Sequence, residues 1–361
     1  MAAVTSGKNT AYLDLLRAVA IVLVVNSHLD DLYPIPQLGT GGMFGNELFF
    51  FVSGYGLFLS YRKSCEPIGG WLMRRTIRVY EPLFIVATFL VLVGDIQIHT
   101  VSDFFWLYVV STRFWFLPAI TACYIPIYLV ISSIETKKGF LYLFTILGGA
   151  YLLIFFIFAE KTEWITENYT VQPEVTVPLR MIYYFSTMVI GVYAARFYAE
   201  ISGDTCDLPW LLLSAAGYYL FVASLGRFVP FPLQIIDRIP ALLFLVFAFR
   251  LARHPWLDRF VAGHLSGAVG LLAGVSLQIY LVHEYILHLE TLRAIAFPAN
   301  LVVFAVATLA LSAIFERMHF GRQPKGQKVR HLEGSAAVSQ TDSSISVPAT
   351  VAFHRRVNPL L

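Results

Sequence analysis

The 361-residue sequence has little charge for its length. Only 14% of its residues are charged, whereas 57% are hydrophobic and the mean hydropathy is +0.68. Because soluble domains carry about a quarter charged residues, we expect lipid rather than water around much of this chain. The net charge of +3 is small, and no stretch interleaves Lys and Arg with aromatic residues as a nucleic-acid surface does. Membrane lipid is therefore an expected partner, and nucleic acid is not.

Cysteine is also scarce. Cys65, Cys123 and Cys206 are widely spaced and odd in number, which excludes a disulfide framework and a paired zinc-ligand motif. No metal cofactor is expected. A cleavable signal peptide is not evident either, because the first apolar run contains Arg17 and ends in the polar residues His28, Asp30 and Asp31, with no small-x-small cleavage site at that end. That run is expected to be a retained first helix.

Long apolar runs dominate the rest of the chain and predict an all-α integral membrane protein with about ten transmembrane helices. A span needs about 20 mostly apolar residues. The candidates are residues 11–29, 44–62, 80–95, 115–134, 139–159, 181–199, 209–226, 239–252, 268–289 and 297–316. Residues 101–114 are too few and too polar to span, and we expect them to be interfacial or re-entrant.

The basic residues give an orientation. Nineteen of the 26 Lys and Arg residues fall on the side of the two termini, and six fall on the other side. The positive-inside rule therefore places both termini in the cytoplasm. Residues 1–319 are expected to form the membrane domain. Residues 320–361 form a polar tail that we expect to be disordered.

Arg17 and His28 are ionisable residues of the predicted first helix. They are eleven positions apart, which is three turns plus about 20°, so they share one face about 16 Å apart. Ionisable residues inside a membrane usually mark a functional site. The alternatives are an Arg17 that reaches the inner headgroups and an interfacial His28.

The second helix begins with Glu47 and continues through Ser53 and Gly54. Glu47 starts near the level of His28, and a carboxylate beside an imidazole can orient it and raise its basicity. Alternatively, Glu47 is favoured by the dipole at the helix N-terminus. Gly54 allows the close approach of a ligand or, as an equal alternative, of another helix.

Two further groups of polar residues stand out. Arg74, Arg75 and Arg78 form a basic cluster that can hold phosphates through charge-assisted hydrogen bonds or can contact anionic lipid. Tyr280 and His283 share one face of a late helix, where polar residues also link neighbouring helices.

Together these segments resemble the acyltransferase-3 family of multi-spanning membrane acyltransferases. The matching stretches are RAVAIVLVVNSH (17–28), GNELFFFVSGYG (45–56), WLMRRTIRVYEP (71–82), WFLPAI (115–120), FSTMVIGVYAA (185–195) and SLQIYLVH (276–283). Two departures are Glu81 before Pro82 and the Asn46-Glu47 pair, where the family usually has Val-Asp.

The resemblance implies an enzyme that moves an acyl group, usually acetyl, from cytoplasmic acyl-CoA to a sugar hydroxyl of a cell-envelope glycan or lipid-linked saccharide. It implies a location in the bacterial inner membrane. By position, His28 is the implied catalytic histidine, with Glu47 as its possible orienter. The implied acyl-CoA residues are Arg17, Ser53, Gly54, Arg74, Arg75 and Arg78. Trp115, Tyr280 and His283 are expected to line a substrate pocket.

The sequence is also compatible with three other functions. A transporter or channel for a small polar solute also places ionisable residues and Gly-broken helices inside the membrane. A scaffold protein is a second alternative. The third is the other multi-spanning O-acyltransferase superfamily, whose histidine falls late in the chain, so that His283 would be its candidate.

Overall fold

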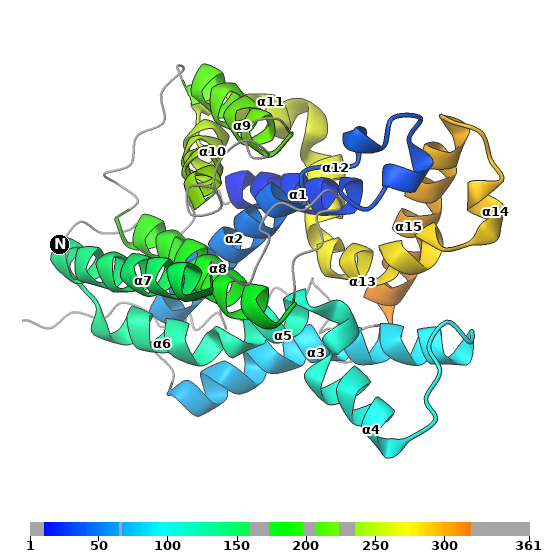
Figure 1. Cartoon of the computed structure of the whole chain (residues 1–361), viewed down its shortest axis with the longest axis horizontal. Coiled ribbons are helices and arrows are strands. Elements are labelled where there is room, and N and C mark those ends of the chain that lie inside the picture. Colours follow the sequence, from blue (N-terminus) through cyan, green and yellow to red (C-terminus); the bar gives the residue numbers. More distant parts are fainter. Residues whose placement is uncertain (1–10, 65–66, 159–172, 198–206, 224–234, 319–361) are drawn as a thin grey trace, which may run out of the picture. The chain divides into compact units, whose positions relative to one another are not determined.

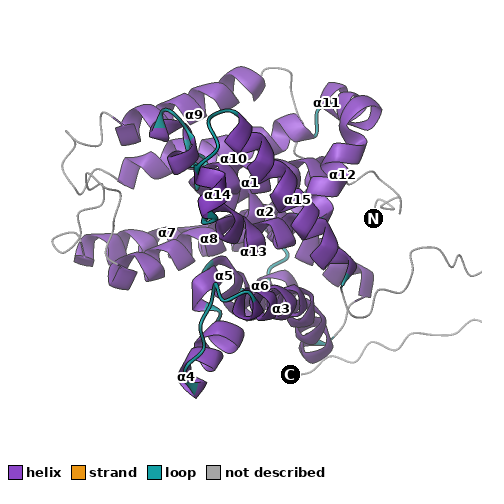
Figure 2. Cartoon of the chain, turned by 90° about the vertical axis from the view of Figure 1, so that its right-hand side faces the viewer, coloured by secondary structure: helices purple, strands orange, loops and turns teal. Residues whose placement is uncertain are grey.

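A computed structural model describes residues 11–64, 67–158, 173–197, 207–223 and 235–318. Every regular element in these ranges is a helix, which confirms the predicted all-α class (Figures 1 and 2). The predicted tail, residues 320–361, lies outside the described residues.

The helices occur where the apolar runs predict them. In chain order they are α1 (Ala11–Asn26), α2 (Gly42–Ser64), α3 (Ile68–Leu92), α4 (Val101–Phe104) with the π-helical η3 (Phe105–Val110), α5 (Phe116–Ala122), α6 (Tyr124–Ser133), α7 (Lys137–Phe158), α8 (Pro173–Arg196), α9 (Asp207–Ala223), α10 (Arg238–Ala252), α11 (Pro255–Phe260), α12 (Ser266–Gly274), α13 (Ser276–Leu287), α14 (Glu290–Arg293) and α15 (Ala299–Arg317). Each of the ten predicted runs overlaps at least one of these helices.

Helix α1 ends three residues earlier than predicted. The Asn26 side chain donates hydrogen bonds of 2.8 Å to the carbonyls of Leu38 and Thr40, and its oxygen accepts one of 2.6 Å from the Tyr33 hydroxyl. These contacts tie the helix end to the following loop. His28 therefore lies in a turn after the helix, where its backbone N–H bonds to the Val25 carbonyl three residues back.

Two other runs differ from their predicted bounds. Helix α3 begins at Ile68 rather than at residue 80, because Arg74, Arg75 and Arg78 are helical residues that an apolar-run criterion leaves out. The run predicted as one span over 268–289 is broken next to Val275. There the stretch Pro255–Gly274 meets Ser276–Leu287 at an angle of 72°.

Three described helical stretches are long and apolar enough to cross a membrane, namely Phe116–Ser133, Lys137–Ile157 and Ala299–Arg317. The bent pair around Val275 would be a fourth. Helix α1, with 16 residues, is only about 24 Å long, shorter than the roughly 30 Å bilayer core. The count of ten spans and the orientation of the termini therefore stay predictions.

Helix α7 carries an extended apolar surface that the other described helices leave exposed. Its Leu141, Ile146 and Leu153 side chains are more than half exposed, on a helix that is apolar along nearly its whole length. A continuous apolar surface of this kind is unfavourable in water. The surface of α7 is suited to a lipid environment.

Helix α2 packs against α1 on one side and α8 on another, and α8 in turn packs against α7 (Figure 1). Glycine permits the closest contact. A Cβ atom on Gly54 would collide with the backbone carbonyl of Met188, and one on Gly191 would collide with that of Phe51. Helices α2 and α8 therefore touch backbone to backbone, and this contact fixes the position of α2.

Candidate active site

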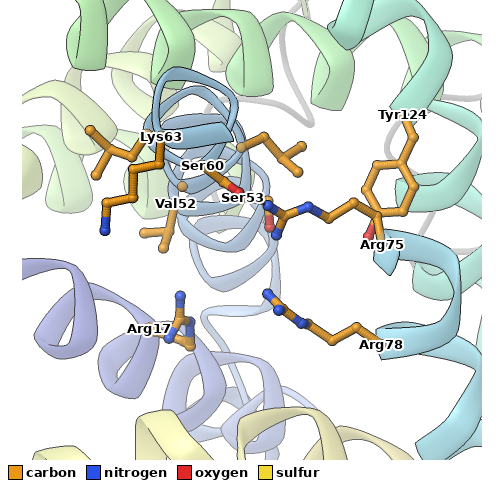
Figure 3. Close-up of a pocket in the computed structure, with 11 residues that line it drawn as sticks. Arg17, Val52, Ser53, Ser60, Lys63, Arg75, Arg78 and Tyr124 are labelled. Atoms are coloured by element: carbon orange, nitrogen blue, oxygen red, sulfur yellow. Dashed lines mark hydrogen bonds between the residues drawn. The ribbon is translucent and has the colours of Figure 1, made fainter. Parts of the chain in front are cut away.

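One face of α2 is open to a cavity. Ser53, Gly56 and Ser60 recur at spacings of three and four residues, which places them on a single stripe of the helix. All three line a cavity of about 370 Å³ between α1, α2, α3 and α6 (Figure 3). The complete lining is Arg17, Val52, Ser53, Gly56, Leu57, Leu59, Ser60, Lys63, Arg75, Arg78 and Tyr124.

Four of these lining residues are cations, and we call the cavity the cationic pocket. Arg17, Lys63 and Arg78 extend toward one common space in Figure 3. The fourth cation, Arg75, donates a hydrogen bond to the Ser60 hydroxyl and lies over the Trp71 ring, 5.8 Å from its centroid. No lining residue in the part of the chain that the structure describes is acidic, so the pocket suits an anionic ligand.

Only some of the predicted acyl-CoA residues line the cationic pocket. Arg17, Ser53, Arg75 and Arg78 line the cationic pocket, whereas Arg74 is exposed and is absent from the lining. Gly54 also does not line it. Its contact with Met188 matches the alternative of close helix packing.

Sequence reasoning missed three polar lining residues, Lys63, Ser60 and Tyr124. In the sequence analysis, Lys63 contributes only to the count of basic residues that orients the chain in the membrane. Its position ten residues after Ser53, near the same stripe of α2, was the available signal.

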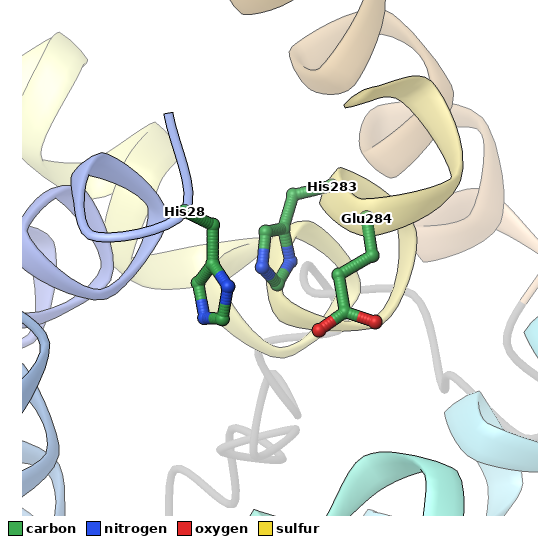
Figure 4. A group of neighbouring side chains, drawn as sticks. All are labelled: His28, His283 and Glu284. Atoms are coloured by element: carbon green, nitrogen blue, oxygen red, sulfur yellow. The ribbon is translucent and has the colours of Figure 1, made fainter. Parts of the chain in front are cut away.

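The second group of polar side chains lies beyond the other end of α1. The rings of His28 and His283 meet edge to face, with their centroids 5.0 Å apart (Figure 4). These residues are separated by more than 250 positions in the sequence, and the packing of α1 against α13 brings them together. We call them the histidine pair.

The hydrogen bonds of His283 fix its tautomer. Its Nδ1 lies 2.8 Å from the Tyr280 carbonyl and 3.2 Å from the Ile279 carbonyl. Because a carbonyl can only accept, Nδ1 carries the proton and donates it. The other nitrogen, Nε2, is then a bare acceptor, and it is buried without a hydrogen-bond partner among the described residues.

A carboxylate does accompany the histidine pair, but it comes from Glu284. One ring nitrogen each from His28 and His283 and one carboxylate oxygen of Glu284 all lie within 4.8 Å of one another. Glu47, proposed from the sequence as the partner of His28, is fully buried and accepts a hydrogen bond from Tyr183. The structure thus brings Glu284, which sequence reasoning missed, next to His28 and places Glu47 in another cluster.

Aromatic rings connect the histidine pair to Trp115. The Tyr280 ring lies 5.9 Å from that of His283, Phe116 lies 5.4 Å from Tyr280, and Trp115 lies 6.2 Å from Phe116. The guanidinium of Arg180 stands 4.9 Å from the centroid of the Trp115 ring. Trp115, Phe116 and Tyr280 therefore form one continuous row of rings, which we call the aromatic wall. It connects two of the residues predicted to line a substrate pocket, Trp115 and Tyr280, to the third, His283, beside His28.

Helix α1 links the two polar sites. Arg17 contributes to the cationic pocket from within α1, and His28 follows the end of the same helix. Phe49 lies one turn before Ser53 on the stripe of α2, in the direction of His28. It packs beside Ile21 and 5.6 Å from the Phe116 ring. An apolar stretch thus separates a cationic pocket from a pair of histidines.

These features define a class, a protein whose described residues form helices and that has a cation-lined pocket and a histidine–carboxylate cluster arranged along one helix. Comparison with family models matches residues 10–317 to the acyltransferase-3 family, described as an acyltransferase domain. The match covers most of the 361 residues, and the chain belongs to this family. No curated protein and no solved structure matches the chain.

Family membership supports an acyltransferase activity and, together with the apolar helices, indicates an integral membrane protein. It confirms the resemblance that the motifs gave. Neither the donor nor the acceptor follows from the family match.

Proposed function

We propose that this protein is an acyl-CoA-dependent O-acyltransferase that transfers an acyl group, acetyl in the simplest case, to a sugar hydroxyl of a cell-envelope or exported glycan. The observation that carries this proposal is the placement of a four-cation pocket and a histidine pair along the same helix. Acyl-CoA combines an anionic nucleotide with a thin arm that ends in a thioester. The two sites fit the two ends of such a donor.

In this proposal the cationic pocket binds the phosphates of CoA on the cytoplasmic side of a bacterial inner membrane. Arg75 and Arg78 extend from one helix and Arg17 faces them from another, so phosphate oxygens can be held from two sides. Ser53 lines the pocket farther toward His28, where the arm of the donor would pass. This arrangement delivers the acyl group without moving CoA across the membrane.

The histidine pair performs the transfer. His28 removes the proton from the acceptor hydroxyl, and the resulting oxygen attacks the thioester carbonyl. During the reaction, a small rotation of the His28 ring would let its N–H donate a hydrogen bond to the bare Nε2 of His283, which would leave the other ring nitrogen of His28 as the base. Glu284 stabilises the charge that His28 gains, and His28 then returns its proton to the leaving CoA thiolate.

The acceptor is a glycan or a lipid-linked saccharide bound along the aromatic wall of Trp115, Phe116 and Tyr280. Sugar rings present apolar C–H faces that pack on aromatic side chains, and Arg180 above Trp115 adds a hydrogen-bond donor. This wall adjoins the histidine pair, so a hydroxyl of the bound sugar would face His28.

A transporter was the alternative from the sequence, and the bent pair around Val275 is a feature that transporters share. Transporters built from two repeats have such broken helices at corresponding positions in both halves of the chain. The described residues contain one such bent pair, and family membership favours acyl transfer.

The test uses membranes or purified full-length protein with radiolabelled acetyl-CoA and a glycan extract. Wild type is expected to label the glycan. His28→Ala is expected to lose label by about 10²-fold or more while it still inserts and folds, as for removal of a general base. Equal labelling by both proteins would eliminate His28 as the base. No labelling with any acyl-CoA, combined with uptake of a solute, would favour transport.

A further inference from the structure

The cluster of His28, His283 and Glu284 has a second chemical capability (Figure 4). We propose that it binds a divalent transition-metal ion of the Zn²⁺ type, which acyl transfer does not require and which blocks it. The binding itself is independent of the enzyme's activity. Only the blocking effect rests on the function proposed above.

The donor set selects the class of ion. Two imidazoles and one carboxylate, with a fourth position left for water, are the ligands of many three-residue zinc sites. Imidazole nitrogen favours Zn²⁺, Co²⁺, Ni²⁺ and Cu²⁺, whereas Mg²⁺ and Ca²⁺ prefer sites made of oxygen atoms alone. The cluster should therefore discriminate against the abundant alkaline-earth ions.

His283 is already arranged as a metal ligand. Metal-binding histidines generally donate their other ring N–H to a carbonyl or carboxylate, which orients the ring and raises its basicity. The Nδ1 of His283 makes this kind of bond to the Tyr280 carbonyl at 2.8 Å. Its Nε2 offers a lone pair that no described residue engages in a hydrogen bond, on a side chain that is 1% exposed.

The other two ligands have room to adjust. In a tetrahedral zinc site, neighbouring ligand atoms are about 3.3 Å apart, given zinc–nitrogen bonds of about 2.0–2.1 Å. The candidate ligand atoms are within 4.8 Å of one another. Because His28 and Glu284 are partly exposed, small rotations of these two side chains can close the site around an ion that His283 anchors.

Metal binding would remove the groups that the transfer reaction uses. A ring nitrogen of His28 that is bonded to the ion cannot accept the proton of the acceptor hydroxyl. The lone pair of His283 and the charge of Glu284 would also be occupied. The ion and the acyl acceptor therefore compete for the same cluster.

Direct binding to the purified full-length protein, stripped with a chelator, tests the proposal. Zn²⁺ is titrated by calorimetry, and Co²⁺ serves as a probe whose visible absorption reports tetrahedral coordination. Wild type is expected to bind one ion per chain, and Glu284→Gln and His283→Ala should each weaken binding at least about tenfold. The matched control is His288→Ala, an exposed histidine on the same segment, which should bind as wild type does.

The possible outcomes separate the two proposals. Saturable binding that is weakened in both variants supports the metal site, even in a preparation that transfers no acyl group to any acceptor. Acyl transfer without saturable binding overturns the metal site and leaves the enzyme proposal intact. Binding that is undiminished in Glu284→Gln and His283→Ala also overturns it. In an active preparation, Zn²⁺ should inhibit with the midpoint measured for binding, and a chelator should restore activity.

Discussion

Tyr183 on α8 donates a hydrogen bond to the carboxylate of Glu47 on α2, and both side chains are buried. Arg238 lies close to this pair, with its guanidinium 5.1 Å from the centroid of the Tyr183 ring. The second oxygen of Glu47 has no hydrogen-bond partner in the part of the chain that the structure describes. Glu47 therefore belongs to a polar contact between helices, and this contact leads to the first prediction.

We predict that Tyr183→Phe lowers the stability of the protein by about 1–3 kcal/mol, because it leaves a buried carboxylate without its donor. Thermal unfolding in detergent measures this loss. Glu47→Gln, which keeps the shape of the side chain, is expected to fold and to retain most of its transfer rate. A drop in kcat of about 10²-fold or more in a stable Glu47→Gln protein would restore Glu47 as the orienter of His28.

A second prediction concerns the contact between α2 and α8. Gly54→Ala and Gly191→Ala each place a methyl group against a backbone carbonyl, so we expect each to destabilise the protein by about 1–3 kcal/mol or more. The yield of folded protein and its unfolding temperature are the measurements.

Gly148→Ala on α7 is the matched control for this comparison. A Cβ atom there meets nothing within 4 Å, and alanine favours a helix over glycine by about 0.5–1 kcal/mol. Gly148→Ala should therefore be neutral or stabilising. If the Gly54→Ala protein were as stable as the Gly148→Ala protein but failed to use acyl-CoA, the role of Gly54 would be to leave space for the donor rather than for helix packing.

The sequence predicted the positions of the helices well, because apolar runs reflect burial in protein or lipid directly. It predicted their ends less well. The end of α1 depends on hydrogen bonds from Asn26 to residues more than ten positions later, and the start of α3 lies among arginines. Such boundaries are set by tertiary contacts and by charge, which a count of apolar residues does not include.

The candidate site was predictable only in part for a related reason. Arg17, Ser53, Arg75 and Arg78 were recognised from local motifs, and the structure brings them to one pocket. Glu284 was missed because neighbouring helix residues point about 100° apart, so His283 gave no reason to consider it. The pairing of His28 with His283 comes from the packing of two helices that are distant in sequence.

The third prediction compares two arginines on α3. Arg78 lines the cationic pocket, whereas Arg74, four residues earlier, does not. Loss of one charge-assisted hydrogen bond costs about 1.5–3 kcal/mol, so Arg78→Ala should raise the KM for acetyl-CoA about 10- to 100-fold. Arg74→Ala should raise it less, and both should leave the unfolding temperature near that of wild type.

The measurement is the KM for acetyl-CoA at low and moderate salt. Binding that depends on Arg78 should weaken as salt rises, because ions screen charges at a surface pocket. Equal effects of the two substitutions would mean that the whole basic cluster, rather than the pocket, attracts the donor. That result would favour a general role in contact with anionic lipid.

The fourth prediction separates the two ends of the donor. Ser53 lines the cationic pocket one helical turn from Phe49, so Ser53→Leu should fill the space through which the acyl-bearing arm passes. We expect acetyl-CoA to be used poorly by this variant, while 3′,5′-ADP, which carries phosphates but no arm, binds as it does to wild type. Ser53→Ala removes the hydroxyl without filling the space and should stay close to wild type in both assays.

Loss of nucleotide binding in Ser53→Leu would place the phosphates beside Ser53 and shift the proposed path of the arm. Unchanged use of acetyl-CoA would show that the arm reaches His28 by another route, and α2 would then only support the pocket.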